Sequence, residues 1–155
     1  MSGAVYQQRG PVAQRRAAPV WGPLAVTFTC RAPIDNDELN RLHAEGFGTR
    51  VFDTDWAAQL ERHSAGWVTA YDEGRLVGFV NVAWDGGVHA FVLDTLVAAD
   101  RGREGLGRQL LEHAVEGARA AACEWLHVDW DDEELTAFYI EGCGFVPTKA
   151  GLIPL

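Results

Sequence analysis

TLVAADRGREGLGRQLL, residues 95–111, joins a strand pattern to a helix pattern through a glycine-rich turn. The preceding residues, from His89 to Val97, are rich in Val, Phe, Leu and Thr, which is typical of a strand. From Leu106 onward apolar residues recur at helical spacing, which predicts a helix to about Ala122. A helix start presents unpaired amides and the positive end of a dipole, and glycine lets a ligand approach the backbone. The stretch is therefore a candidate phosphate-binding turn.

The glycine spacing distinguishes between classes of phosphate site. Gly105 and Gly107 form a Gly-x-Gly pair, but the third glycine of the dinucleotide fingerprint is missing. The Gly-Lys-Ser/Thr of a Walker A loop is missing as well. The order of hydrophobic strand, Gly-x-Gly and helix resembles the pyrophosphate loop of the GNAT superfamily, the acyl-CoA-dependent N-acetyltransferases. In that comparison Val97 matches the strand-end valine of the family.

The resemblance implies that backbone amides of this turn hold the pyrophosphate of acetyl-CoA. Gly102 stands where the family has Gln or Arg, so Arg101 or Arg103 is expected to supply that charge. The strand end can also offer N–H donors to the oxyanion that forms during acyl transfer. A strand-to-helix turn without any ligand is the structural alternative. The cofactor-binding residues implied are Leu96, Val97, Arg103, Glu104, Gly105, Leu106, Gly107, Arg108 and Asp132.

A second stretch, WLHVDWDDEELTAFYIEGCGF at residues 125–145, is similar to another GNAT pattern. The family shows a strand valine, then Asn, then Tyr seven residues later, and then Gly-Phe. Asp132 occupies the Asn position, and Tyr139 follows in register. The Gly-Phe pair comes one residue late, which predicts an insertion between Tyr139 and Gly144. An earlier insertion would instead put Ile140 in the tyrosine position.

The resemblance implies direct attack of a primary amine on acetyl-CoA, which requires a base for the ammonium and an acid for the departing thiolate. Tyr139 is the candidate acid, because a phenol with a pKa of about 10 is protonated at neutral pH. Asp94 is the candidate base, because a carboxylate within an apolar strand needs a task or a partner. A water held by Asp129, His127 or a backbone carbonyl is the alternative base. No metal is expected, since no Cys/His cluster has metal-ligand spacing.

The hydrophobic pattern around these motifs predicts one α/β domain with a GNAT-like mixed sheet. Three strands form an antiparallel meander, and a helix then crosses over to a parallel strand, with further helices on the flanks. Residues 1–20 are expected to be a flexible tail, and residues 21–155 the acyltransferase domain. The predicted elements are strands at 24–31, 67–71, 76–84, 89–97 and 125–130, a last strand or hairpin from 144, and helices at 35–45, 54–63, 106–122 and 131–142.

Composition sets limits on partners and location. The formal net charge is −9, and the three arginines of residues 1–20 make the remainder more acidic still, which disfavours nucleic acid. No apolar run is long enough to span a membrane, and three widely spaced cysteines are typical of a reducing cytoplasm. Together with the resemblance, which implies transfer of acetyl from acetyl-CoA, these features lead us to expect a cytoplasmic N-acetyltransferase acting on a cationic small molecule or peptide. A homodimer is the assembly expected on general grounds, and a non-catalytic acyl-CoA-binding regulatory module is the alternative function.

Overall fold

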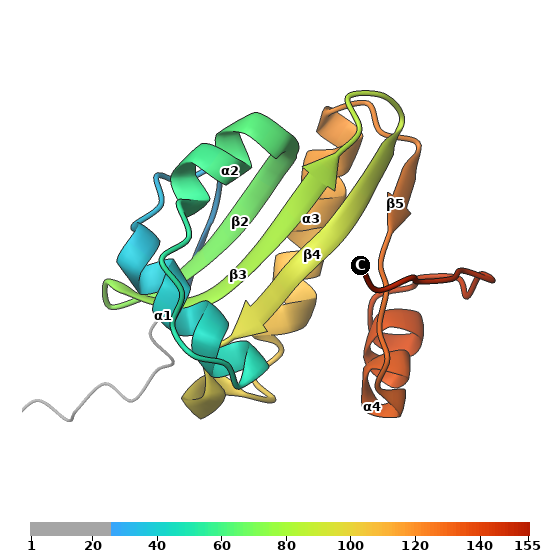
Figure 1. Cartoon of the computed structure of the whole chain (residues 1–155). Helices are drawn as coiled ribbons and strands as arrows, with labels where there is room; N and C mark the ends of the chain where they lie inside the picture. The colour runs from blue at the N-terminus through green and yellow to red at the C-terminus, as the bar shows by residue number, and fades with distance from the viewer. Residues whose placement is uncertain (1–25) are drawn as a thin grey trace, which may run out of the picture.

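The computed structural model describes residues 26–155, so the expected tail at residues 1–20 lies outside the described part. One five-stranded sheet has the order β1-β2-β3-β4-β5 (Figure 1). Neighbours from β1 to β4 are antiparallel, and β5 runs parallel to β4. The predicted mixed sheet is thus confirmed. The strands are β1 (Thr27–Cys30), β2 (Ser64–Asp72), β3 (Arg75–Trp84), β4 (His89–Val97) and β5 (Trp125–His127).

Helices cover both faces of this sheet (Figure 1). One face carries α1 (Asn36–Phe47) and α2 (Trp56–His63), and the other carries α3 (Leu106–Ala120). Aspartates begin the first two helices, because Asp35 accepts the Glu38 amide and Asp55 accepts the Ala58 amide. No helix within residues 26–155 is long and apolar enough to cross a membrane.

The core lies on both sides of the central strand β3. Residues 76–82 of this strand are all buried, because α1 and α2 cover one face and α3 covers the other. The largest fully buried side chains include Phe79 of β3, Leu39 of α1, Leu60 of α2 and Leu110 of α3. Burial of these four side chains holds α1, α2 and α3 against the sheet. The N-terminus of α3 is thereby held beside the end of β4.

Helix α1 approaches the sheet closely at Gly46. A Cβ atom at this position would lie 2.6 Å from Leu96 Cδ2, and Leu96 is only 2 % exposed, so its side chain would have to shift within the packed core. Glu45 next to it accepts a hydrogen bond from the Ala99 amide at 2.7 Å. The end of α1 therefore packs on the last residues of β4 and holds the turn that follows this strand.

Gly46→Ala is expected to destabilise the fold by about 1–3 kcal/mol, because the added methyl group overpacks the core against Leu96. Gly117→Ala is the matched control, since Gly117 also lies in a helix but a Cβ there meets nothing within 4 Å. The control should gain about 1 kcal/mol from helix propensity. Urea unfolding measures both changes, and a stabilising Gly46→Ala would contradict the close packing.

Strand β4 contains a bulge that the sequence pattern did not indicate. Leu93 pairs with Asn81 and Leu96 with Phe79, so two residues of β4 oppose the single Val80 of β3. One of the two is Asp94, whose φ of 52° is in the left-handed region. A bulge bends a strand and redirects a side chain, and here it changes the direction of Asp94.

Strands β4 and β5 pair over only three positions, from His89↔Trp125 to Phe91↔His127. The predicted strand at 125–130 was therefore too long. Figure 1 shows the two strands diverging as β5 leads toward helix α4 (Glu133–Thr136). Among residues 26–155, the edge of β4 beyond Phe91 consequently has no strand partner on this side, which leaves backbone groups available to a ligand.

The predicted helix at 131–142 forms in two parts. After α4 the chain continues as η2 (Ala137–Gly142), a π-helix. A π-helical turn takes more residues than an α-helical one, so it accommodates an extra residue in the segment where the insertion was predicted. The predicted strand or hairpin from 144 was wrong, because residues 143–155 contain no regular secondary structure. Pro147 and Pro154 lack the N–H groups that a strand would use.

Candidate active site

The N-terminus of α3 presents free amides at the turn that the sequence analysis selected. Gly105 precedes the helix with a φ of 80°, and no side chain caps the helix start. The first bond into the helix runs from the Gln109 amide to the Gly105 carbonyl at 3.2 Å. The amides of residues 106–108 therefore have no partner within the helix. Such a group of N–H donors at the positive end of a helix dipole suits an anionic oxygen.

The arginines around this turn have different partners. Arg101 donates to Asp72 and, at 2.8 Å, to Glu104. These two carboxylates raise the pKa of the Arg101 guanidinium, so this residue stabilises the turn. Arg108 pairs with Glu112 at 3.0 Å on the surface of the helix. Arg103, with a φ of 66°, forms no ion pair within residues 26–155, and is the arginine left to meet a phosphate.

Gly107 has a packing role that its sequence motif does not reveal. A Cβ atom here would lie 3.3 Å from Phe138 Cζ and 3.8 Å from Val97 Cγ2. The start of α3 thus packs tightly between the end of β4 and η2. A side chain at position 107 would displace Phe138, whereas a Cβ at Gly105 would meet nothing within 4 Å.

Tyr139 is buried in η2 beside the end of β4. It is 6 % exposed and is enclosed by the rings of Trp130, Phe138 and Phe145. Burial raises the pKa of the Tyr139 phenol, and the nearby Thr95 hydroxyl only partly opposes this effect. The two hydroxyls do not meet full hydrogen-bond geometry, so Thr95 Oγ1 is buried without a partner. The phenol is therefore held protonated next to a polar atom of β4.

Asp94 lies at the β4 bulge and pairs with a histidine from α1. His43 Nε2 is 3.3 Å from Asp94 Oδ1, and the two side chains are 23 % and 19 % exposed. A carboxylate can only accept, so Nε2 carries the shared hydrogen. The His43 ring packs against Phe47 and Trp56, with ring centroids 4.7 and 5.2 Å away, and this packing holds the pair in one orientation.

Three other predicted residues lie away from this pair. His127 Nε2 is 2.9 Å from His89 Nδ1, and His127 pairs with Phe91 at the end of the β4–β5 pairing, about 10 Å along the strand from Asp94. Asp129 is exposed beyond β5. Asp132 caps α4 by accepting the Glu134 amide at 2.8 Å, so its carboxylate has a local structural role.

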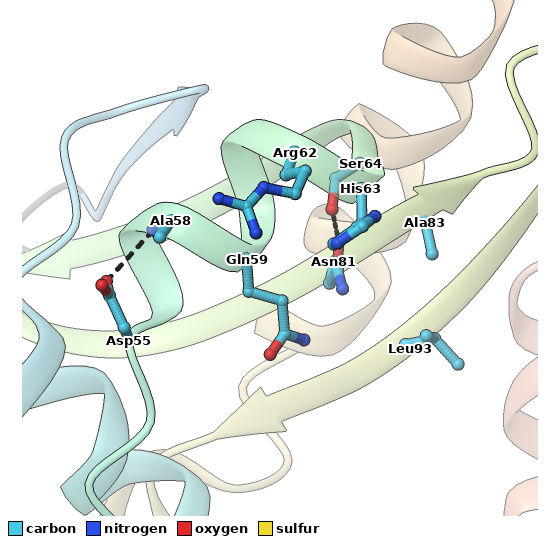
Figure 2. A pocket seen from close by; sticks show the side chains of 9 residues that line it. All are labelled: Asp55, Ala58, Gln59, Arg62, His63, Ser64, Asn81, Ala83 and Leu93. Atoms are coloured by element: carbon cyan, nitrogen blue, oxygen red, sulfur yellow. Dashed lines mark hydrogen bonds between the residues drawn. The ribbon is translucent and has the colours of Figure 1, made fainter.

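A surface pocket of about 550 Å³ opens beside the Asp94 bulge, between α2 and the sheet. Its floor includes Asn81 of β3 and Leu93 of β4, which are direct cross-strand partners. Its wall includes Gln59 and Arg62 of α2, and Figure 2 shows these side chains around the space. Leu93 precedes Asp94 in the chain, so the pocket ends one residue from the candidate base, which is not itself among the lining residues. A small molecule can thus lie on the sheet face beneath α2.

Residues 34–145 match the family model described as Acetyltransferase (GNAT) family, which covers more than half of the chain. The chain belongs to the GNAT family of acetyltransferases. It is therefore an acyl-CoA-dependent transferase that uses acetyl-CoA. None of the curated proteins matches it significantly.

Solved structures share the GNAT fold at low sequence identity. A putative acetyltransferase from Agrobacterium tumefaciens is 23 % identical, with a TM-score of 0.71, over 83 % of this chain and 99 % of the other. A GNAT family protein from Streptococcus pneumoniae is 18 % identical, with a TM-score of 0.69, over 84 % and 98 %. AAC(6')-Iy, solved with a CoA bisubstrate analog, is 13 % identical, with a TM-score of 0.67, over 84 % and 97 %.

The structure of this GNAT chain brings together most residues selected from the sequence. The α3 turn, the end of β4 and Tyr139 meet where β4 and β5 diverge. Sequence reasoning missed His43 as the partner of Asp94 and Asn81 as part of the pocket floor. His43 lies 51 residues before Asp94, so no local spacing connects the two. A polar Asn within an otherwise apolar strand was the one available signal for the pocket. Among residues 26–155 no three metal-ligating side chains gather.

Proposed function

We propose that this GNAT enzyme transfers acetyl from acetyl-CoA to a primary amine by direct attack, without a covalent enzyme intermediate. The uncapped start of α3, next to the open edge of β4, is the observation that carries the proposal. Amides around residues 103–108 would bind the pyrophosphate, with Arg103 adding charge. The open edge of β4 would then receive the pantetheine arm and present the Leu96 and Val97 backbone to the thioester carbonyl. Acetyl-CoA supplies the activated acetyl group.

The two catalytic roles are assigned to residues on either side of β4. Asp94, held by His43, takes a proton from the ammonium of the acceptor, and the neutral amine then attacks the thioester carbonyl. Tyr139 donates a proton to the departing thiolate, and its raised pKa keeps that proton available at neutral pH. Either Tyr139 or Ile140 could occupy the tyrosine position of the family pattern. The position of Tyr139 beside Thr95 supports the alignment that uses Tyr139.

The acceptor is proposed to be a cationic small molecule or peptide that carries one reactive amine. The formal net charge of −9 attracts cations toward the protein. Solved structures that share the fold include a glucosamine-6-phosphate N-acetyltransferase from Arabidopsis thaliana and an aminoglycoside acetyltransferase from a soil metagenome. The free thiols of Cys30, Cys123 and Cys143 support action in the cytoplasm.

Gly105→Ala is expected to raise the acetyl-CoA KM by about tenfold, because it strains the left-handed turn that directs the amides toward the phosphates. Gly86→Ala is the matched control. Gly86 also has a positive φ, of 81°, and open space around it, but it lies between β3 and β4, at the other end of β4 from the α3 turn. Steady-state assays of both variants measure the effect. An acetyl-CoA KM that rises equally in both, or in neither, would remove the phosphate site from this turn.

A non-catalytic acyl-CoA-binding module is the alternative function, and it predicts binding without turnover. Calorimetry with CoA, together with a thiol-release assay over small amines and a lysine peptide, distinguishes the two. Binding of CoA with release of its thiol supports the enzyme. Binding with no release for any amine would overturn the proposal.

A further inference from the structure

Asn81 is a polar residue in the centre of the sheet whose hydrogen bonds the fold leaves incomplete. It is 2 % exposed and lies on β3 between Trp67 of β2 and Leu93 of β4. Burying an amide is costly unless its donors and acceptor find partners. Because Asn81 lines the pocket under α2, the small exposed part of its side chain faces that pocket.

One neighbour sets the orientation of this amide. Ser64 Oγ donates to Asn81 Oδ1 at 2.6 Å, which is drawn as a dashed line in Figure 2. The carbonyl end is thus held by β2, and Nδ2 has no hydrogen-bond partner within residues 26–155. Asn40 gives the contrast, because its Nδ2 donates to Thr54 at 3.0 Å and its Oδ1 accepts from Trp56 at 3.0 Å. The fold satisfies both ends of Asn40, whereas the donors of Asn81, a residue that lines the pocket, have no partner within the described part of the chain.

The charges around the pocket do not favour a polycation. Asp55 is the one carboxylate among the residues that line it. Its Oδ1 already accepts from the Ala58 amide at 3.1 Å and from Asn36 Nδ2 at 3.0 Å. Arg62 adds a positive charge on the same helix. A second ammonium group in this pocket would therefore meet the Arg62 guanidinium, and its one carboxylate partner would be Asp55, whose Oδ1 is already engaged.

We infer that Asn81 selects an acceptor that carries a hydrogen-bond-accepting oxygen close to its amine. The substrate class is an amino alcohol or amino sugar rather than an alkyl polyamine. This inference rests on the proposed function. The hydroxyl oxygen of the acceptor accepts from Asn81 Nδ2, while its carbon skeleton lies on Leu93 and Ala83. Its amine then lies toward Asp94, the residue after Leu93.

Two matched amines test this selection with acetyl-CoA and a thiol-release assay. The first, trans-2-aminocyclohexanol, and the second, cyclohexylamine, share a ring and an amine but differ in the hydroxyl group. The measured quantity is the ratio of their kcat/KM values in the parent and in Asn81→Asp. The carboxylate keeps the shape and the bond from Ser64 but cannot donate. Differences in amine basicity cancel, because the same two amines are compared in each protein.

The ratio is expected to fall by about tenfold or more in Asn81→Asp, with the acetyl-CoA KM unchanged. Ser64→Ala is the second variant, in case the buried carboxylate impairs folding. It releases the Asn81 carbonyl, lets the amide rotate, and should lower the ratio by a smaller factor. An unchanged ratio in both variants, or a parent that prefers spermidine to aminocyclohexanol, would overturn the inference and leave the proposed function standing. No thiol release by the parent with any amine would overturn the proposed function itself.

Discussion

Tyr139→Phe is expected to lower kcat by about 100-fold while acetyl-CoA binding persists. Phenylalanine keeps the packing against Trp130, Phe138 and Phe145 but removes the proton that the thiolate would take. Steady-state kinetics give kcat, and calorimetry with CoA gives the affinity. A kcat equal to that of the parent would show that Tyr139 is a packing residue only.

The pH dependence separates this role from that of a base. Burial raises the pKa of the Tyr139 phenol, so the protonated form persists above the ordinary value of about 10. The parent therefore loses no kcat through deprotonation of Tyr139 as the pH rises from neutral to about 9. The deficit of Tyr139→Phe should stay constant over this range, because thiolate release does not depend on the protonation of the acceptor amine.

Asp94→Asn is expected to lower kcat/KM for the acceptor by about 100-fold at neutral pH, with recovery as the pH rises. Asparagine keeps the shape of the side chain at the bulge but cannot take a proton. At higher pH more of the acceptor amine is already neutral, and the need for a base falls. A pH profile between about 7 and 9, over which both proteins remain folded, measures this recovery. A deficit that is the same at every pH would assign Asp94 a structural role.

Variants of His43 test whether this residue acts through Asp94. His43→Ala removes the group that holds the carboxylate at 3.3 Å, whereas His43→Gln keeps an N–H donor in the same place. The alanine variant should lose part of the activity, and the glutamine variant should recover most of it. The double variant with Asp94→Asn should be no slower than Asp94→Asn alone, because residues that act as a unit are not additive. If the losses of activity in the two single variants add up in the double variant, His43 and Asp94 act independently. A silent Asp94→Asn would favour a water as the base.

Local chain chemistry explains the parts of the fold that were predictable. Apolar alternation around the turns at 72–74 and 85–87 was sufficient for the antiparallel meander. For the starts of the first two helices the sequence offered Asp35 or Asp37 and Thr54 or Asp55, and the structure uses Asp35 and Asp55. Gly105, followed by apolar residues at helical spacing, marked the start of α3. These features arise from contacts between residues close in the chain, so their signal is present in the sequence.

Contacts between distant residues decided the remaining features. The bulge at Asp94 arises because β4 must keep register with β3 on both sides of Val80, and no local pattern encodes that demand. The end of β5 at His127 depends on where this strand diverges from β4, which itself continues to Val97 (Figure 1). The packing of Gly107 against Phe138 joins helices that lie about thirty residues apart in the sequence.

The sequence by itself determined the antiparallel meander, the glycine-rich turn before α3 and the family pattern around Tyr139. Each is a repeat of apolar residues, a glycine pair or a fixed spacing within one segment. Only the tertiary structure decided that His43 holds Asp94, and that Ser64 holds the carbonyl end of Asn81, which lines a pocket under α2. The physical reason is that a hydrogen bond between side chains depends on how α1, β2, β3 and β4 pack together. That packing is a property of the whole core and of no single stretch of the chain.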